Sequence, residues 1–335
     1  MSFSELKGAS LFVTGGTGSF GRAFVRTLLD DGIEFSRLVI YSRDELKQFE
    51  MQQELADKRL RYFIGDVRDR DRMTAAMQGI DFVIHAAALK QVPAAEYNPM
   101  EFIKTNVNGA ENVIHAALAN GVHKVVALST DKAAHPINLY GATKLCSDKL
   151  FVAANNFAGG RRTRFAVTRY GNVVGSRGSV LPYFRGLLKG GAASLPITDP
   201  RMTRFWISLQ QGIAFVLANF ARMQGGEIFV PKIPSIRIVD LAEALAPDTP
   251  THIIGIRPGE KLHEIMCPGD EAHLTIEYPD HFVIHPGIVF FDEAINYTRN
   301  GRGEHGTRVA DGFEYHSGHN PHFLGVPEIR QVIGS

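Results

Sequence analysis

The chain has 335 residues, 44% hydrophobic and 21% charged, which is the composition of an ordinary globular protein. Its formal net charge is +1 without a dense basic cluster, so the sequence does not predict a nucleic-acid partner. The two cysteines predict neither a disulfide framework nor a zinc site, and without a signal peptide or an apolar run of ~20 residues we expect a cytoplasmic protein that does not insert into a membrane.

Short β-rich apolar runs alternate with helical patterns through the first half of the chain. Strands are expected at residues 10–15, 37–42, 61–66, 81–87, 124–130 and 164–170. Helices are expected at residues 19–31, 44–58, 69–78, 99–120 and 138–157. This alternation predicts an α/β fold, a Rossmann-type doubly wound parallel sheet that binds ligands at the carboxyl ends of its strands.

After residue 170 the alternation stops, and Gly- and Pro-rich segments separate shorter elements. We therefore predict a cofactor-binding Rossmann domain at residues 1–170 and a smaller C-terminal α+β substrate-binding lobe at residues 171–335. The two halves are expected to pack as one unit, with some C-terminal segments returning to the sheet. Trp206 and the apolar residues that follow it are expected to form a core helix.

A glycine-rich turn, TGGTGSFG, follows the first strand and opens a helix. Gly15 permits the tight turn, Gly18 lets the backbone approach a pyrophosphate, and Gly21 lets the helix pack close to the sheet. Since the helix N-terminus then faces the anion, we expect a dinucleotide at this turn. The residues expected to contact it are Gly15, Thr17, Gly18, Ser19, Phe20 and Gly21.

The second strand ends in Ser42 and Arg43, and Lys47 lies one turn into the next helix. A hydroxyl and two cations suit a 2′-phosphate, which favours NADP over NAD. The alternative is that both cations are solvated and that Asp44 binds the ribose of NAD. Asp66 and Val67, after the third strand, are expected to border the adenine. Ala86, after the fourth strand, is expected to lie beside the ribose and phosphates.

The segment LSTDKAAHPINLYGATK carries the residues expected to do chemistry. Tyr140 and Lys144 share one helix face, where the ammonium should lower the pKa of the phenol so that Tyr140 acts as a base near neutral pH. A tyrosine base suits an enzyme that removes a hydride from a carbinol. Asp131 and Lys132 beside it indicate a further step, unless they form only an ion pair that closes a loop.

These segments together resemble the inverting UDP-N-acetylglucosamine 4,6-dehydratases of the extended short-chain dehydrogenase/reductase superfamily. The resemblance rests on TGGTGSFG, YSRDELKQ, GDVRDRDR, HAAALKQVPAAEYNP, KTNVNGAENV, LSTDKAAHPINLYGATK, RYGNVVGSRGSV, MTRFWI, GGEIFVPKIPS and IIGIRPGEKLHE. It covers nearly the whole chain and is weakest over residues 285–310. Asp131-Lys132 is the most specific motif, because ordinary nucleotide-sugar 4,6-dehydratases carry Asp-Glu there. The family implies a homo-oligomer, a dimer or higher, and a place in pseudaminic acid biosynthesis.

The resemblance implies a three-stage reaction on UDP-N-acetylglucosamine. Tyr140 takes the C4 hydroxyl proton while hydride passes to NADP, with Lys144 on the nicotinamide ribose and Thr130 near the C4 oxygen. Lys132 then removes the C5 proton, and Asp131 protonates the departing C6 hydroxyl. Hydride return to C6 and protonation of C5 on the opposite face give UDP-2-acetamido-2,6-dideoxy-β-L-arabino-hex-4-ulose. Because a base role requires a lowered lysine pKa and Asp131 opposes it, the division of roles between the two stays open.

Substrate contacts are expected from both halves of the chain. Lys90 suits a phosphate or a sugar hydroxyl, and Asn172 the diphosphate. Arg204 and Arg257 offer guanidinium groups to the diphosphate, and Glu260 a carboxylate to a ribose hydroxyl. No metal site is predicted, because the loop does not align the three histidines near the C-terminus, His316, His319 and His322. These histidines are expected to be solvated.

Two other interpretations stay open. A retaining nucleotide-sugar 4,6-dehydratase or a 4-epimerase would use the same tyrosine and nucleotide, and the Asp131-Lys132 pair argues against both. A catalytically silent NADP-binding regulator is the non-enzyme alternative, and an intact Thr130, Tyr140 and Lys144 argue against it.

Overall fold

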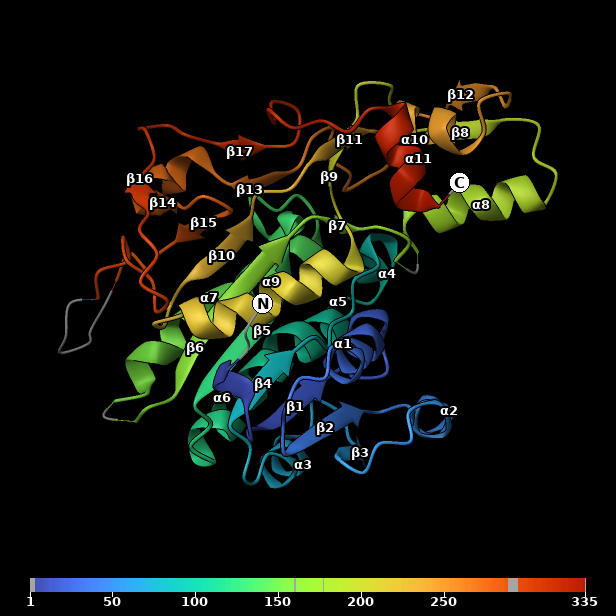
Figure 1. The fold of residues 1–335 in the computed structure, drawn as a ribbon. Helices are drawn as coiled ribbons and strands as arrows, with labels where there is room; N and C mark the ends of the chain where they lie inside the picture. The colour runs from blue at the N-terminus through green and yellow to red at the C-terminus, as the bar shows by residue number, and fades with distance from the viewer. Residues whose placement is uncertain (1–3, 160, 177, 289–294, 335) are drawn as a thin grey trace.

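A ten-stranded sheet is the centre of the computed structural model, which describes residues 4–159, 161–176, 178–288 and 295–334 (Figure 1). Its strands are β1 (Ser10–Thr14), β2 (Arg37–Ser42), β3 (Leu60–Ile64), β4 (Phe82–His85), β5 (Lys124–Thr130), β6 (Arg164–Tyr170), β10 (Ile228–Pro231), β14 (Thr275–Glu277), β15 (His281–Ile284) and β16 (Thr307–Arg308). Their order is β16-β14-β15-β10-β6-β5-β4-β1-β2-β3. The strands from β3 to β10 are parallel neighbours, and β15, β14 and β16 continue the sheet antiparallel.

Helices cover this sheet on both faces. They are α1 (Ser19–Asp30), α2 (Glu45–Glu54), α3 (Arg70–Ala76), α4 (Val92–Tyr97), α5 (Pro99–Phe102), α6 (Gly109–Ala119), α7 (Leu139–Phe157) and α9 (Leu209–Arg222). Leu11, Phe12 and Val13 are consecutive in β1 and all fully buried. Because successive side chains of a strand point to opposite faces, both faces of the sheet must be covered at β1.

The predicted Rossmann-type fold is confirmed, and the six predicted strands and their helices lie within a few residues of their expected bounds. The expected helix at 99–120 differs, because a π-helical turn at Ile103–Asn108 separates α5 from α6. Such widened turns often occur at functional sites. Here the turn places Asn106 against the loop that follows β4, where it bonds both backbone polar groups of Leu89 at 2.9 Å.

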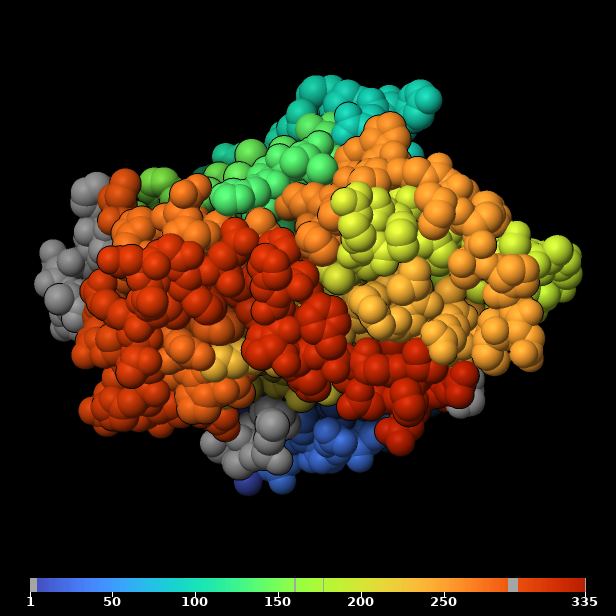
Figure 2. All heavy atoms as spheres, turned by 90° about the horizontal axis from the view of Figure 1, so that it is seen from above, coloured from blue at the N-terminus to red at the C-terminus, as the bar shows by residue number. Residues whose placement is uncertain are grey.

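The C-terminal segments form three smaller sheets and additional helices above the main sheet. These elements are β7 (Asn172–Val173), β8 (Leu195–Ile197), β9 (Thr203–Ile207), β11 (Ser235–Arg237), β12 (Thr251–Ile253), β13 (Ile265–Cys267), β17 (Tyr315–His316), α8 (Val180–Lys189), α10 (Ile238–Leu245) and α11 (Val326–Ile333). In Figure 2 the yellow, orange and red segments make up most of the face seen from above. Because β10 and β14–β16 lie in the main sheet, the division at residue 170 does not separate two sheets and stays a prediction.

The predicted core helix is present as α9, but it does not begin at Trp206, so that part of the prediction is wrong. Trp206 lies in β9, the middle strand of the sheet β11-β9-β7, and is buried against Ile236 and Leu241. The helix α9 starts only at Leu209, because Ser208 forms a capping box with Gln211. The start of this helix is thus set by the cap at Ser208, although the apolar pattern begins earlier.

The described ranges contain neither a helix long and apolar enough to cross a membrane nor a group of three His, Cys, Asp or Glu side chains that could hold a metal. The C-terminal histidines were expected to be solvated. His316 is instead half-buried between His263 and His319, with ring centroids 5.0 and 4.9 Å away. His322 is exposed, as expected.

Candidate active site

A cavity of about 580 Å³ lies where the parallel strands end, which is the ligand position in open α/β sheets. The predicted site residues that line it are Gly15, Thr17, Gly18, Ser19, Phe20, Lys47, Ala86, Lys90, Thr130, Lys132, Tyr140, Lys144 and Asn172. Other predicted residues lie outside its wall: Gly21, Ser42, Arg43, Asp66, Val67, Asp131, Arg204, Arg257 and Glu260. The wall also contains residues that the sequence analysis did not name, among them Gln91, Ser129, Tyr170, Ser176 and Ser179.

The turn between β1 and α1 leaves no room for a side chain at Gly15 and Gly21. Gly15 has a φ of 63°, and a Cβ there would lie 3.0 Å from the backbone nitrogen of Ala87. A Cβ on Gly21 would lie 2.4 Å from the carbonyl oxygen of Gly16, so this glycine lets α1 pack against the turn itself. Gly18 is the N-cap of α1 and makes no side-chain cap bond. The first N–H groups of α1 therefore have no side-chain acceptor at the N-cap, which suits an anion.

Buried polar contacts hold the ends of β1 and β4 together. The Thr14 hydroxyl accepts from the backbone N–H groups of Ala86 and Ala87 at 3.1 Å and lies 2.8 Å from His85 Nδ1. Burial and, to a smaller extent, the charge of Lys144 lower the pKa of His85 to about 3, so the imidazole is neutral. The segment that brings Ala86 to the cavity is thus held in place without an ion pair.

The turn after β2 carries the residues expected at the cofactor ribose. Ser42 is buried, and its hydroxyl lies 2.7 Å from that of Thr17. Asp44 is the N-cap of α2, where it accepts from the Lys47 backbone and pairs with the Lys47 ammonium. Arg43 is exposed, with Nη1 3.9 Å from Asp66 Oδ2. Asp44 therefore has a structural role that competes with binding a ribose.

Tyr140 and Lys144 reach the cavity from the first turns of α7. Asn138 caps this helix by accepting from the Gly141 backbone at 2.8 Å. Burial raises the pKa of Tyr140 to about 12, although the charge of Lys132 and a hydrogen bond with Thr130 act to lower it. The expectation that Lys144 lowers the pKa of the phenol is wrong for this structure, because desolvation dominates and the neighbouring cation is Lys132.

Asp131 and Lys132 follow β5 and contact each other directly. Asp131 is fully buried, and its Oδ1 lies 3.0 Å from Lys132 Nζ and accepts from the Thr130 hydroxyl at 2.9 Å. Burial alone would lower the pKa of Lys132, but the carboxylates of Asp131 and Glu264 outweigh it and raise that pKa. The structure thus favours an ammonium at Lys132, whereas the expected base role requires a neutral amine.

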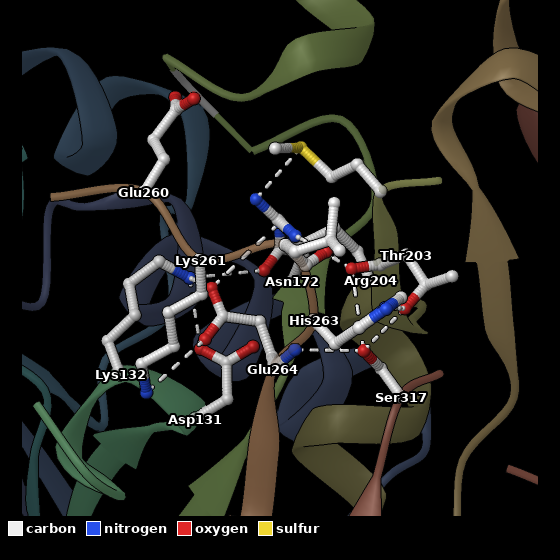
Figure 3. Close-up of polar contacts among 12 residues, drawn as sticks. Asp131, Lys132, Asn172, Thr203, Arg204, Glu260, Lys261, His263, Glu264 and Ser317 are labelled. Carbon is white, nitrogen blue, oxygen red and sulfur yellow. Dashed lines mark hydrogen bonds and ion pairs between the residues drawn. The ribbon is translucent and has the colours of Figure 1, made fainter. Parts of the chain in front are cut away.

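Only some of the residues expected to contact the substrate line the cavity. Asn172 lies at the cavity, with Oδ1 3.5 Å from Lys132 Nζ. Arg204 is buried and points inward, donating to the Thr203 carbonyl at 2.7 Å. Arg257 is half-exposed, with Nη1 3.8 Å from Glu260 Oε1. The Glu260 carboxylate points away from Asp131 and Lys132 (Figure 3). Arg204, Arg257 and Glu260 are not part of the cavity lining.

Two ionisable residues close to Asp131 and Lys132 were missed by the sequence analysis. Glu264 Oε1 lies 3.2 Å from Lys132 Nζ, and Lys261 donates to the Ala134 carbonyl at 2.6 Å (Figure 3). Both belong to the segment IRPGEKLHE, in which only Arg257 and Glu260 were assigned. The available signal was the density of ionisable residues in this short stretch.

Comparisons with known proteins identify the family of the chain. Residues 11–286 match the model of a family described as polysaccharide biosynthesis proteins. The chain is 60% identical over 324 residues to UDP-N-acetylglucosamine 4,6-dehydratase (inverting) of Campylobacter jejuni, covering 97% of each chain. It is 40% identical to UDP-glucose 4-epimerase of Rickettsia canadensis, covering 97% of this chain and 95% of that protein. Among solved structures, Pen from Bacillus thuringiensis is 36% identical, with a TM-score of 0.86 and 98% of each chain covered.

The glycine turn gives a testable prediction. Gly21→Ala should weaken binding of a pyridine dinucleotide about tenfold or more, because the added methyl group displaces the start of α1. Titration calorimetry measures the affinity. The matched control is Gly186→Ala in α8, where a Cβ meets no atom within 4 Å. This control should keep wild-type affinity, and equal affinity of the Gly21→Ala protein would contradict the assignment of the turn.

Proposed function

Because the chain belongs to the polysaccharide biosynthesis protein family and, within it, to the inverting UDP-N-acetylglucosamine 4,6-dehydratases, we propose that its active site catalyses the inverting 4,6-dehydration. The substrate is UDP-N-acetylglucosamine, and the product is UDP-2-acetamido-2,6-dideoxy-β-L-arabino-hex-4-ulose. The observation that carries the proposal is the direct 3.0 Å contact of Asp131 and Lys132 beside Thr130 and Tyr140 at the cavity. A simple oxidoreductase needs the tyrosine but has no use for this second acid–base pair.

The residues at the glycine turn fit a pyridine dinucleotide. Gly15 and Gly21 have neighbours that a side chain would displace, and the α1 N-terminus is open for a pyrophosphate. Lys144 reaches the cavity wall and would hold the nicotinamide ribose. When bound, a dinucleotide would supply the acceptor and then the donor of one hydride, so the net reaction would be a dehydration.

The first stage is proton removal at the C4 hydroxyl by Tyr140. Since burial keeps the phenol neutral in this structure, Tyr140 becomes a base only when positive charge acts on it. Lys132 already lowers its pKa, and Lys144 lies one helical turn away on α7. Thr130 hydrogen-bonds the phenol and would orient the C4 oxygen.

The second stage is elimination of water across C5 and C6. For Lys132 to remove the C5 proton it must first lose its own, and Asp131 Oδ1 is the acceptor at 3.0 Å. The same transfer leaves Asp131 protonated, as the departing C6 hydroxyl requires. Because Asp131 is fully buried, its proton would reach the cavity through the Thr130 hydroxyl, 2.9 Å away. One internal proton transfer thus prepares both the base and the acid.

On the substrate side, Lys90 and Asn172 line the cavity and are proposed to contact the nucleotide sugar. Arg204 and Arg257 are proposed for the diphosphate, and Glu260 for the ribose. Guanidinium groups favour such bidentate contacts. A cytoplasmic location, a homo-oligomeric assembly and a role in pseudaminic acid biosynthesis are further proposals that rest on the family resemblance.

A 4-epimerase is the second candidate function, because the Rickettsia relative that carries this name covers nearly the whole chain. An epimerase needs only the oxidation at C4 and its reversal. It has no use for Asp131 and Lys132 as an acid–base pair. The same pair argues against a retaining dehydratase, as the sequence predicts.

Incubation with UDP-N-acetylglucosamine in deuterated water tests the proposed function. NMR of the product should show the L-arabino configuration with one solvent deuterium at C5, because C5 is deprotonated and then reprotonated. A D-xylo product would contradict inversion, and UDP-N-acetylgalactosamine without solvent deuterium would establish the epimerase. Lys132→Met keeps the length of the side chain without its amine and should give no deuterium at C5.

We also propose NADP rather than NAD as the dinucleotide. Lys47 reaches the cavity and Arg43 is exposed beside it, whereas Asp44, the alternative ribose ligand, caps α2 and pairs with Lys47. The two cations support a 2′-phosphate, which would compete with Asp44 for the Lys47 ammonium.

The cofactor proposal predicts tighter binding of NADP than of NAD by the wild type. Arg43→Ala should reduce that preference by about tenfold or more, as expected for loss of a charge-assisted hydrogen bond. Fluorescence titration with both dinucleotides measures it, and Arg26→Ala on the exposed side of α1 is the control. Wild-type affinity for NAD equal to or above that for NADP would contradict the proposal.

A further inference from the structure

Glu264 is a buried carboxylate that the proposed mechanism does not use. It lies directly before β13, and its side chain is only 2% exposed. Oε1 lies 3.2 Å from Lys132 Nζ and 3.9 Å from Arg204 Nε, and Oε2 lies 3.9 Å from Lys261 Nζ. Oε2 has no hydrogen-bond partner among the described residues. Because burying a charge is costly, this carboxylate has to be explained by the cations around it.

Lys132 connects Glu264 to the cavity. Oxygen atoms of three side chains lie within 3.5 Å of its Nζ, namely Asp131 at 3.0 Å, Glu264 at 3.2 Å and Asn172 at 3.5 Å. Lys132 and Asn172 line the cavity, whereas the two carboxylates are not part of its lining. Figure 3 shows the side chains of Asp131 and Glu264 next to each other beside Lys132. Lys132 is therefore the residue that joins Glu264 to the cavity wall by a direct contact.

The backbone at Glu264 is fixed by contacts on both sides. Its N–H donates to the Ser317 hydroxyl at 2.9 Å, and that hydroxyl lies 2.7 Å from the hydroxyl of Thr203. Earlier in the same segment, Lys261 donates to the Ala134 carbonyl and Asn138 donates to the Gly259 carbonyl at 2.8 Å. The segment that supplies the carboxylate is thus bonded to the turn between β5 and α7 that supplies Lys132.

We propose that Glu264 is a positioning residue for the dehydration, which holds the Lys132 side chain at the cavity and keeps it charged before the reaction begins. This inference rests on the proposed function, because it assigns a role in the same acid–base cluster. Among the described residues, five charged or titratable groups face Lys132: those of Asp131, Tyr140, Arg204, Lys261 and Glu264. Asp131 and Glu264 are the two anions that stabilise the ammonium. When Asp131 takes up the lysine proton, Glu264 is the carboxylate that remains charged beside the pair.

The direct test measures the charge of Lys132 without turnover. Competitive acetylation with acetic anhydride at a series of pH values, followed by mass spectrometry, reports the fraction of neutral amine at Lys132. Glu264→Gln keeps the shape of the side chain and removes its charge. The midpoint for Lys132 should fall by about 1–3 pH units, as expected when an opposite charge in direct contact is lost. An unchanged midpoint in folded Glu264→Gln protein would overturn the proposal.

The matched control is Glu271→Gln, which removes a carboxylate 3.3 Å from Lys149 and outside the cavity wall. It should leave the Lys132 midpoint at the wild-type value. Glu264→Asp is the second variant if Glu264→Gln does not fold. It keeps the charge but withdraws it by one methylene, so the midpoint should stay near wild type while kcat falls about tenfold and KM changes little. Wild-type kcat in Glu264→Asp would contradict the positioning role.

Failure of the proposed function gives a different result. If the wild type does not turn over UDP-N-acetylglucosamine but the Lys132 midpoint moves in Glu264→Gln, the reaction is wrong and the control of Lys132 by Glu264 stands. If the wild type is active and the midpoint does not move, the reaction stands and Glu264 has no such role.

Discussion

The site depends on one buried ion cluster, in which the Lys132 ammonium lies between the carboxylates of Asp131 and Glu264. Asp131 and Lys132 are adjacent in the sequence, but Glu264 follows more than 130 positions later, so the cluster forms only when the C-terminal segment packs on the turn after β5. Two further contacts join the same segments, from Lys261 to Ala134 and from Asn138 to Gly259. Because a buried charge without a partner is strongly destabilising, the cluster constrains where the C-terminal segment can lie.

The parallel sheet provides the rigid part of the site. Strand ends deliver the glycine turn, the Ala86 segment, Thr130 and Asn172 to one edge, and contacts such as that of Thr14 with the Ala86 and Ala87 backbone hold neighbouring ends in register. Tyr140 and Lys144 follow from the capped start of α7. A dinucleotide and a nucleotide sugar would thus meet on a surface whose backbone is already ordered, which is the condition for catalysis by positioning.

The sequence predicts well what local patterns determine. The alternating strands and helices, the glycine turn and the tyrosine–lysine spacing on α7 each have a short-range cause, and the structure has all of them. It predicts less of the C-terminal half, where short strands pair with distant partners and a cap at Ser208 ends the strand that contains Trp206. The role of Glu264 could not be predicted, because its contact with Lys132 joins residues that are far apart in the sequence and depends on the tertiary fold. Because this contact contributes to the shift of the Lys132 pKa, the sequence alone could not predict whether that pKa is raised or lowered.

The central claim is that oxidation at C4 is transient and serves the dehydration. The most direct measurement follows the hydrogen on C4, with UDP-N-acetylglucosamine deuterated at that position and the product examined by NMR and mass spectrometry. The account predicts that deuterium moves to C6 of the same sugar, since one bound dinucleotide takes it and returns it. Deuterium that stays at C4, is lost to water or accumulates in free dinucleotide would contradict the account.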